Sequence, residues 1–166
     1  PERATPHTEA IFGLNYPTNP CGATEFTNYV SGSGAILGNA EILNDSKDLY
    51  IQSELNHGWV ITNVKAYAGK LSQMPLTSAG NPDVEKFPIK PFFARNTNIA
   101  SVRIPLQNLP ACYDVCVFIQ IVEIDLFGNI LNDDAVWLQG NSIGNGLSLP
   151  HCTHVCSVAN IANISH

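Results

Sequence analysis

The chain has 166 residues and a formal net charge of −6, a length that suits one globular domain. Charged residues make up 13% of it, about half of the roughly 25% found in typical domains. Eight scattered Lys and Arg residues form no basic patch, which argues against nucleic acid as a partner. No apolar stretch approaches the roughly 18 residues of a membrane span.

The first 34 residues are rich in Pro, Thr, Asn, Gly and Ser, and their apolar residues follow no clear period. The Ser-Gly-Ser-Gly run at residues 31–34 reads as a flexible joint. We therefore expect residues 1–34 to form an extended arm or irregular edge strands, and residues 35–166 to form the folded domain.

Strand patterns begin at residue 40. Residues 40–43 and 49–55 flank a loop rich in Asn and Asp, which predicts a β-hairpin. Residues 59–68 are apolar on both faces, as in a strand covered by the core on one side and by a loop, arm or partner on the other. Residues 71–98 contain several prolines and little periodicity, which predicts a long connection.

The second half continues as short strands. Residues 100–106 alternate between apolar and polar side chains, and residues 115–126 give the strongest strand pattern. Further strands are expected at 135–139 and 155–164, with a glycine-rich loop at 141–146. No segment has a convincing helical period, so the sequence predicts an all-β fold, an antiparallel β-sandwich that is Ig-like or jelly-roll-like.

Five cysteines leave three alternatives open: Cys21, Cys112, Cys116, Cys152 and Cys156. The four late cysteines can form two disulfides that tie residues 112–116 to the C-terminal tail. Alternatively Cys21 takes part and a different cysteine is odd. In the third alternative the four late cysteines bind zinc, with His151 or His154, but zinc sites more often use C-x-x-C spacing. We expect disulfides.

Several features suit an oxidising, extracellular location. Low charge and five cysteines fit secreted proteins better than cytosolic ones, and a first residue other than Met agrees with a removed secretory signal. Asn44 and Asn163 begin N-x-Ser tripeptides, which makes both candidate glycosylation sites.

Oxygen-bearing side chains crowd one predicted turn, and Asp125, Asn129, Asp133 and Asp134 are the candidate metal ligands. Calcium takes six to eight oxygen ligands, often from loops. A polar β-turn explains the same residues without an ion, because Asp and Asn favour local backbone hydrogen bonds. We expect no other cofactor.

Aromatic residues provide candidate ligand or interface positions at Trp59, Phe92, Phe93 and Trp137. Sugar faces stack on aromatic rings, so these residues can form a carbohydrate platform. Tryptophans are also common in cores, and the loop pair Phe92 and Phe93 is the better candidate for an exposed surface.

Catalytic patterns are weak. Glu123 and Asp125 share a face of one predicted strand and lie in the range for paired carboxylates. Cys152 next to His151 could give a nucleophile and a base, but only if the thiol is not oxidised. The sequence has no catalytic motif of the hydrolase, P-loop or zinc-protease type, and we expect no enzyme.

The order of short motifs between residues 40 and 140 resembles a group of uncharacterised secreted domains in bacterial and fungal surface proteins. The motifs are Asn44-Asp45, Leu49-Tyr50-Ile51, Trp59-x-Ile61-Thr62, Tyr67-x-Gly69, Gly80-Asn81-Pro82, Phe87-Pro88 and Ala135-x-Trp137-x-x-Gly140. This resemblance implies a surface location and a β-rich architecture, and it implies no chemistry.

Two functions follow as expectations. The first is an extracellular structural or adhesive surface protein that assembles with itself into a filament or layer, through strand exchange by the N-terminal arm and through an odd cysteine. The alternative is a carbohydrate-binding module, lectin-like and calcium-dependent, with glycans as partners.

Overall fold

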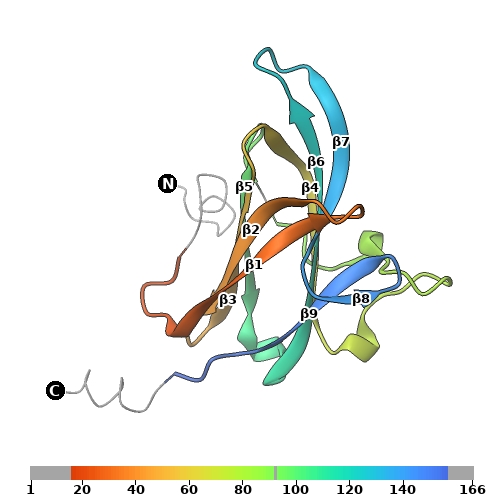
Figure 1. Ribbon diagram of the computed structural model, residues 1–166. Helices are drawn as coiled ribbons and strands as arrows, with labels where there is room; N and C mark the ends of the chain where they lie inside the picture. The colour runs from red at the N-terminus through yellow and green to blue at the C-terminus, as the bar shows by residue number, and fades with distance from the viewer. Residues whose placement is uncertain (1–15, 92, 157–166) are drawn as a thin grey trace.

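The computed structural model describes residues 16–91 and 93–156, and these residues fold into strands joined by turns and three single-turn 3₁₀ helices (Figure 1). The strands are β1 (Cys21–Ser31), β2 (Ile36–Asn44), β3 (Asp48–Leu55), β4 (Trp59–Gly69), β5 (Ile99–Pro105), β6 (Cys112–Ile124), β7 (Ile130–Leu138), β8 (Asn141–Ile143) and β9 (Gly146–Cys152). Within this part of the chain no helix has the length and apolar character of a membrane span.

All strand pairs are antiparallel, and the strands form one sheet in the order β5-β3-β2-β1-β7-β6-β9-β8, with β4 paired to the other side of β6. The predicted all-β class is therefore confirmed. An Ig-like or jelly-roll-like sandwich is a finer description than this pairing supports, and it stays a prediction.

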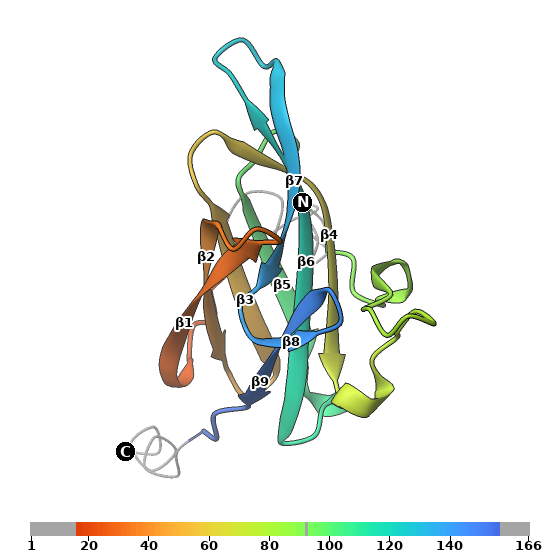
Figure 2. The same ribbon diagram turned by 45° about the vertical axis from the view of Figure 1, so that its right-hand side comes forward.

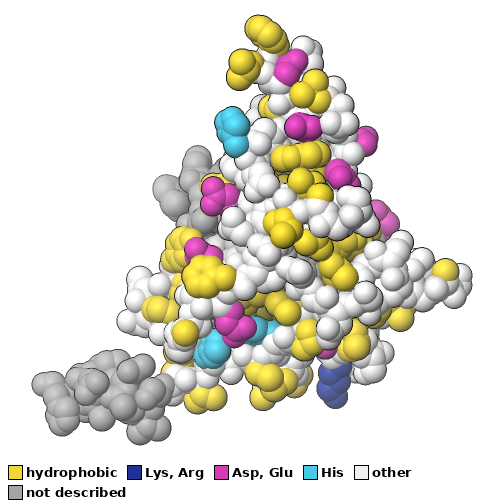
Figure 3. Space-filling model, viewed as in Figure 1, with side chains coloured by type: hydrophobic (Ala, Val, Ile, Leu, Met, Phe, Trp, Pro, Cys, Tyr) yellow, Lys and Arg dark blue, Asp and Glu magenta, His cyan; other side chains and the backbone are white. Residues whose placement is uncertain are grey.

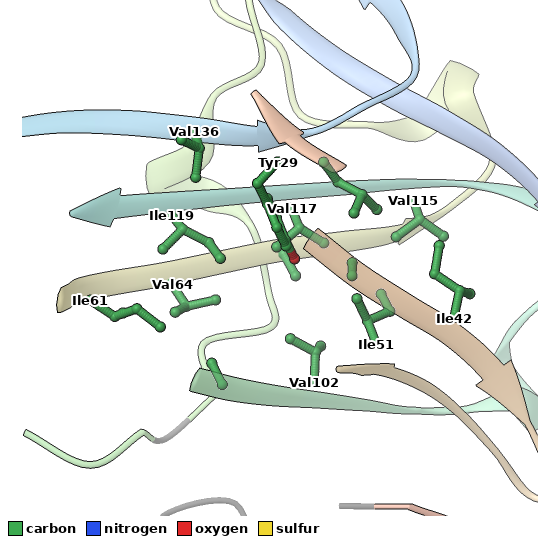
Figure 4. Close-up of a cluster of buried hydrophobic side chains, with 14 of the residues drawn as sticks. Tyr29, Ile42, Ile51, Ile61, Val64, Val102, Val115, Val117, Ile119 and Val136 are labelled. Atoms are coloured by element: carbon green, nitrogen blue, oxygen red, sulfur yellow. The ribbon is translucent and has the colours of Figure 1, made fainter. Parts of the chain in front are cut away.

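The sheet bends so that two groups of strands face each other across one apolar core (Figure 4). Ile42, Ile51 and Val102, from β2, β3 and β5, lie opposite Val64 and Ile119. Alternation along each strand directs every second side chain into this space, which explains the clean alternation predicted for residues 100–106.

The hairpin predicted around residues 44–48 is confirmed. Asp45 closes its turn, because its Oδ1 atom accepts hydrogen bonds from the backbone N–H groups of Lys47, at 2.8 Å, and Asp48, at 2.7 Å. Asn44 and Leu49 are register partners directly beside the turn, so the loop sets which side chains of β2 and β3 reach the core.

Strand β4 is covered on both faces, as its sequence predicts. One face contributes to the main core, and the other packs under the 70–98 connection, where Tyr67 contacts Phe87 and Met74 in a second apolar cluster. Figure 2 shows this connection beside β4, on the side away from β2 and β3. The ammonium of Lys65, almost fully buried, is paired with Glu85 at 2.7 Å.

The predicted arm is wrong for its second half. Cys21–Ser31 is strand β1, which lies inside the sheet between β2 and β7. Its irregular pattern has a physical reason, because β1 carries register shifts near each end and exposes outward-facing residues such as Phe26. Residues 1–15 lie outside the described part of the chain.

The C-terminal third also departs from the prediction. The expected glycine-rich loop at 141–146 is the hairpin of β8 and β9, whose tight turn uses Gly144 with φ of +57°. Glycine permits this conformation at little cost. The high glycine content of residues 141–146 is typical of a loop, which is why the sequence did not predict the two short strands. The expected last strand is absent at Val155 and Cys156, and its remainder lies outside the described residues.

Two disulfides connect distant parts of the sheet, Cys21–Cys156 and Cys112–Cys152. The second joins register partners on β6 and β9. Zinc binding by the late cysteines is therefore wrong, and the alternative in which Cys21 takes part is confirmed. Closing a loop of 40 residues stabilises a fold by about 4 kcal/mol in the chain-entropy description.

Cys116 is the free cysteine, so its inclusion among the disulfide residues is wrong. It lies in the second apolar cluster, and its thiol donates a hydrogen bond to the Leu147 carbonyl oxygen at 3.2 Å. Burial raises the pKa of this thiol to about 12, with a smaller contribution from Asp114. Because only the thiolate is nucleophilic, Cys116 is chemically inert in the folded protein.

We predict that native protein at pH 8 takes up no iodoacetamide, whereas protein unfolded without reductant takes up one equivalent. The reason is that folding buries the one thiol left by the two disulfides. Intact mass spectrometry measures both numbers, and reduction before alkylation, which should give five, is the control. Rapid labelling of the native protein would contradict the placement of Cys116.

Ile119→Ala should lower the free energy of unfolding by about 2–5 kcal/mol, because it leaves a cavity in a fully buried site. Ile36→Ala is the matched control, since Ile36 is mostly exposed, and a change within about 0.5 kcal/mol is expected there. Urea denaturation measures both. An equal loss in the free energy of unfolding of both variants would contradict the placement of Ile119 in the core.

Candidate functional site

Three ligating side chains from distant parts of the sequence meet where β1, β9 and the segment after β9 come together. Glu25 lies on β1, His151 lies on β9, and His154 follows two residues after that strand ends. Their donor atoms all lie within 4.8 Å of one another, and in the described residues this is the one such group of three His, Cys, Asp or Glu side chains.

The Glu25 carboxylate is in contact with both imidazoles. Its Oε2 atom lies 2.7 Å from Nε2 of His154 and 3.3 Å from Nε2 of His151. Both Nε2 atoms are shielded from solvent. The two ring nitrogens therefore converge on one oxygen of the same carboxylate.

The three side chains differ in exposure. His151 is 1% exposed, His154 is 30% exposed, and Glu25 is about half exposed. All three line an open hollow of about 660 Å³, together with Lys70, Ser72 and Asp114 among others. The hollow therefore reaches the exposed parts of Glu25 and His154, whereas both Nε2 atoms lie below the solvent-accessible surface.

A chain of hydroxyl groups holds the His151 ring. Its Nδ1 atom lies 3.1 Å from the Tyr113 hydroxyl, which lies 2.9 Å from the hydroxyl of Thr153. Tyr113 is buried on β6 and directly opposite His151 in the register with β9. Burial lowers the pKa of His151, and the nearby Glu25 carboxylate opposes this shift, so desolvation favours the neutral imidazole.

Asn44 fixes the backbone of His154. The Asn44 amide donates to the His154 carbonyl oxygen at 2.9 Å, and the His154 N–H donates to the Asn44 carboxamide oxygen at 2.9 Å. Because Asn44 is fully buried and its amide nitrogen is engaged, its prediction as a glycosylation site is wrong. The other candidate, Asn163, lies outside the described residues.

Gly22 leaves the room that His154 occupies. A Cβ atom at position 22 would lie 2.8 Å from the His154 Cβ atom, and φ at Gly22 is +73°, a conformation that side chains rarely adopt. Glycine is thus required at this position for two independent reasons.

The four predicted calcium ligands are not brought together as one group, although Asp125 and Asn129 are in contact. The Asp125 carboxylate closes the β6–β7 turn, accepting hydrogen bonds from the backbone N–H groups of Phe127 and Asn129, and these bonds lower its pKa. Asp133 and Asp134 are neighbours on β7 and so point to opposite faces of the sheet. The polar-turn explanation accounts for Asp125 and Asn129.

The predicted aromatic platform is also dispersed. Trp59 and Phe93 pack against the main core, whereas Trp137 is buried in the second cluster against Phe118. Phe92 lies outside the described residues. Trp59, Phe93 and Trp137 therefore serve mainly the packing of the sheet.

The first candidate catalytic pair does not lie on one strand as expected. Glu123 and Asp125 line the same hollow, but strand β6 ends at Ile124, so Asp125 is a turn residue whose carboxylate accepts backbone hydrogen bonds, and Glu123 accepts a hydrogen bond from Asn132 at 2.8 Å. Cys152 is bonded to Cys112 and has no thiol to act as a nucleophile.

Sequence reasoning singled out His151 and His154 only as accessories to a cysteine site, and it missed Glu25. Their His-x-x-His spacing was the available signal. No sequence signal marks Glu25, because it lies 126 positions before His151 and only the pairing of the strands brings the two residues together. Two imidazoles and a carboxylate form a donor set suited to a transition-metal ion.

Comparison with known proteins gives no relationship: no family model, no curated protein and no solved structure matches this chain. The resemblance to secreted surface domains therefore stays a prediction, and the function has to be argued from the molecule itself.

Proposed function

We propose that this protein is an extracellular structural or adhesive protein that binds further copies of itself through the tip of the β6–β7 hairpin. The tip comprises residues 124–134. The observation that carries the proposal is that this tip projects beyond the body of the sheet and exposes a group of large apolar side chains (Figures 1 and 3).

Exposure at the tip is far greater than elsewhere in the hairpin. Leu126 is 97% exposed and Phe127 is 89% exposed, and Ile130 and Leu131 follow on the same projection. Isolated apolar residues on a surface are ordinary, whereas contiguous groups mark sites of interaction. Burial of exposed Phe and Leu side chains against a partner lowers the free energy of the system, because it removes apolar surface from water.

The tip also offers a free strand edge. Strand β1 pairs with β7 only at Val136, Trp137 and Leu138. Residues 130–134 are exposed and pair with β6 alone in the described structure. An unpaired edge accepts another strand, so a second copy can add backbone hydrogen bonds to the apolar contact.

The remaining properties support a role outside the cell. Two disulfides form readily in an oxidising compartment, and the low content of charged residues limits repulsion between packed copies. Cys21–Ser31 already pairs within its own sheet, so this segment is not free to exchange between copies as the sequence led us to expect. The proposal therefore assigns self-association to the hairpin tip and not to the N-terminal arm. The alternative carbohydrate-binding role has no gathered aromatic platform among the described residues to support it.

We predict that the combined substitution Leu126→Ser and Phe127→Ser weakens self-association by at least about tenfold. Burial of one Phe side chain is worth about 1.5–3 kcal/mol, and 1.4 kcal/mol is a factor of ten in affinity. Sedimentation velocity over a range of concentrations, with disulfides intact, measures the association of both proteins.

Leu76→Ser is the matched control, since Leu76 is an exposed leucine of the 70–98 connection, away from the tip. It should associate as the wild type does. A wild-type protein that sediments as a monomer at every concentration would overturn the proposal, as would equal association of the wild type and the tip variant.

A further inference from the structure

We infer that Glu25, His151 and His154 bind one divalent transition-metal ion, with Zn²⁺ as the representative of the class. This site is separate from the proposed assembly surface. It rests on the convergence of three donor atoms, on two solvent-shielded ring nitrogens that share one carboxylate oxygen, and on a hollow that all three residues line.

The distances suit an ion of this size. Two bonds of about 2.0–2.1 Å at a tetrahedral angle place their donor atoms roughly 3.3 Å apart. The Glu25–His151 separation is 3.3 Å, the Glu25–His154 separation is 2.7 Å, and no pair exceeds 4.8 Å. Binding therefore requires adjustments of at most about 1.5 Å, which rotation of the partly exposed Glu25 and His154 side chains can supply while Asn44 holds the His154 backbone.

The way in which the two nitrogens share their partner favours a ligand site over a simple ion pair. Both Nε2 atoms approach the same Glu25 oxygen, Oε2, at 3.3 Å from His151 and 2.7 Å from His154. His151 is almost fully buried, and one carboxylate oxygen is the contact that it shares there with a second imidazole. A metal ion between the three side chains would satisfy both nitrogens and the carboxylate together.

The surroundings of His151 accommodate the tautomer that a metal ligand needs. Metal-binding His usually donates its second ring N–H to a fixed acceptor. The Tyr113 hydroxyl lies 3.1 Å from Nδ1 of His151 and 2.9 Å from the Thr153 hydroxyl, so it can accept from Nδ1–H while it donates to Thr153, which leaves the lone pair of Nε2 for the metal. Tyr113 is thus a positioning residue for the ligand His151.

The segments that carry the ligands are fixed covalently. Cys152 lies between the two histidines, and its bond to Cys112 ties them to β6. Cys21 and Cys156 join the start of β1, four residues before Glu25, to the chain two residues after His154. Sites held by a rigid second layer lose little freedom when the ion binds.

The donor set selects the class of metal. Hard cations such as Ca²⁺ favour six or more oxygen ligands, and this group provides two imidazole nitrogens. Imidazole with one carboxylate suits zinc and its neighbours. Three protein ligands beside an open hollow leave a position for water or a small ligand, as in zinc sites with three protein ligands.

The test is isothermal titration of Zn²⁺ into the disulfide-intact, chelator-treated full chain, with Co²⁺ absorption as a second readout. We expect one ion per chain and the visible bands of four-coordinate cobalt. His154→Gln and Glu25→Gln should each weaken binding by at least tenfold. Tyr113→Phe should weaken it less, while leaving one ion bound per chain.

His57→Gln is the matched control, because His57 is an exposed histidine outside the site, and its affinity should equal that of the wild type. His154 is partly exposed, so its substitution should preserve the fold, which the circular dichroism spectrum without metal checks. Absence of binding by the wild type, or unchanged affinity in a correctly folded His154→Gln protein, would overturn the inference.

Discussion

Burial of both faces of β6 is the constraint on which the rest of the structure depends. Val115, Val117 and Ile119 enter the main core, while Cys116 and Phe118 face the second cluster. Strand β6 pairs with β4 along most of its length and with β7 and β9 on its other edge. A charged residue in β6, or a shorter β6, would therefore remove apolar packing from both clusters, and surface contacts are too weak to compensate for that loss.

The same strand separates the two surfaces that we assign. Cys112 begins β6 beside the Glu25–His151–His154 group, and Ile124 ends it at the hairpin tip. Thirteen residues at about 3.3 Å each span roughly 40 Å. Effects of substitutions at such distances usually add, so we expect the proposed self-association and the proposed metal binding to be independent of each other.

The sequence predicts the elements whose side chains alternate, and it fails where another force determines the structure. The β2–β3 hairpin, β4, β5 and β6 follow from periodicity and turn residues, because burial on defined faces selects those residues. Strand β1 is placed by its neighbours and by Cys21, and its own pattern is too irregular to reveal it. The sequence did not predict the Glu25–His151–His154 group for the same reason, since Glu25 meets His151 only through the pairing of strands that are distant in sequence. Asn44 resembled a glycosylation site because a tripeptide motif contains no information on burial.

Oxidation and metal binding are linked through the chain segment around His154. The two disulfides and the paired hydrogen bonds from Asn44 hold that segment against β1, and a bound ion would join the same two elements through Glu25. Any ligand that binds only the folded state stabilises it by mass action. An ion bound at the proposed site would thus stabilise the arrangement that the disulfides favour, and loss of the disulfides would lower its affinity by loosening the segment that carries His154. The proposed site would therefore suit an oxidising environment, which is also the setting expected from the composition of the chain.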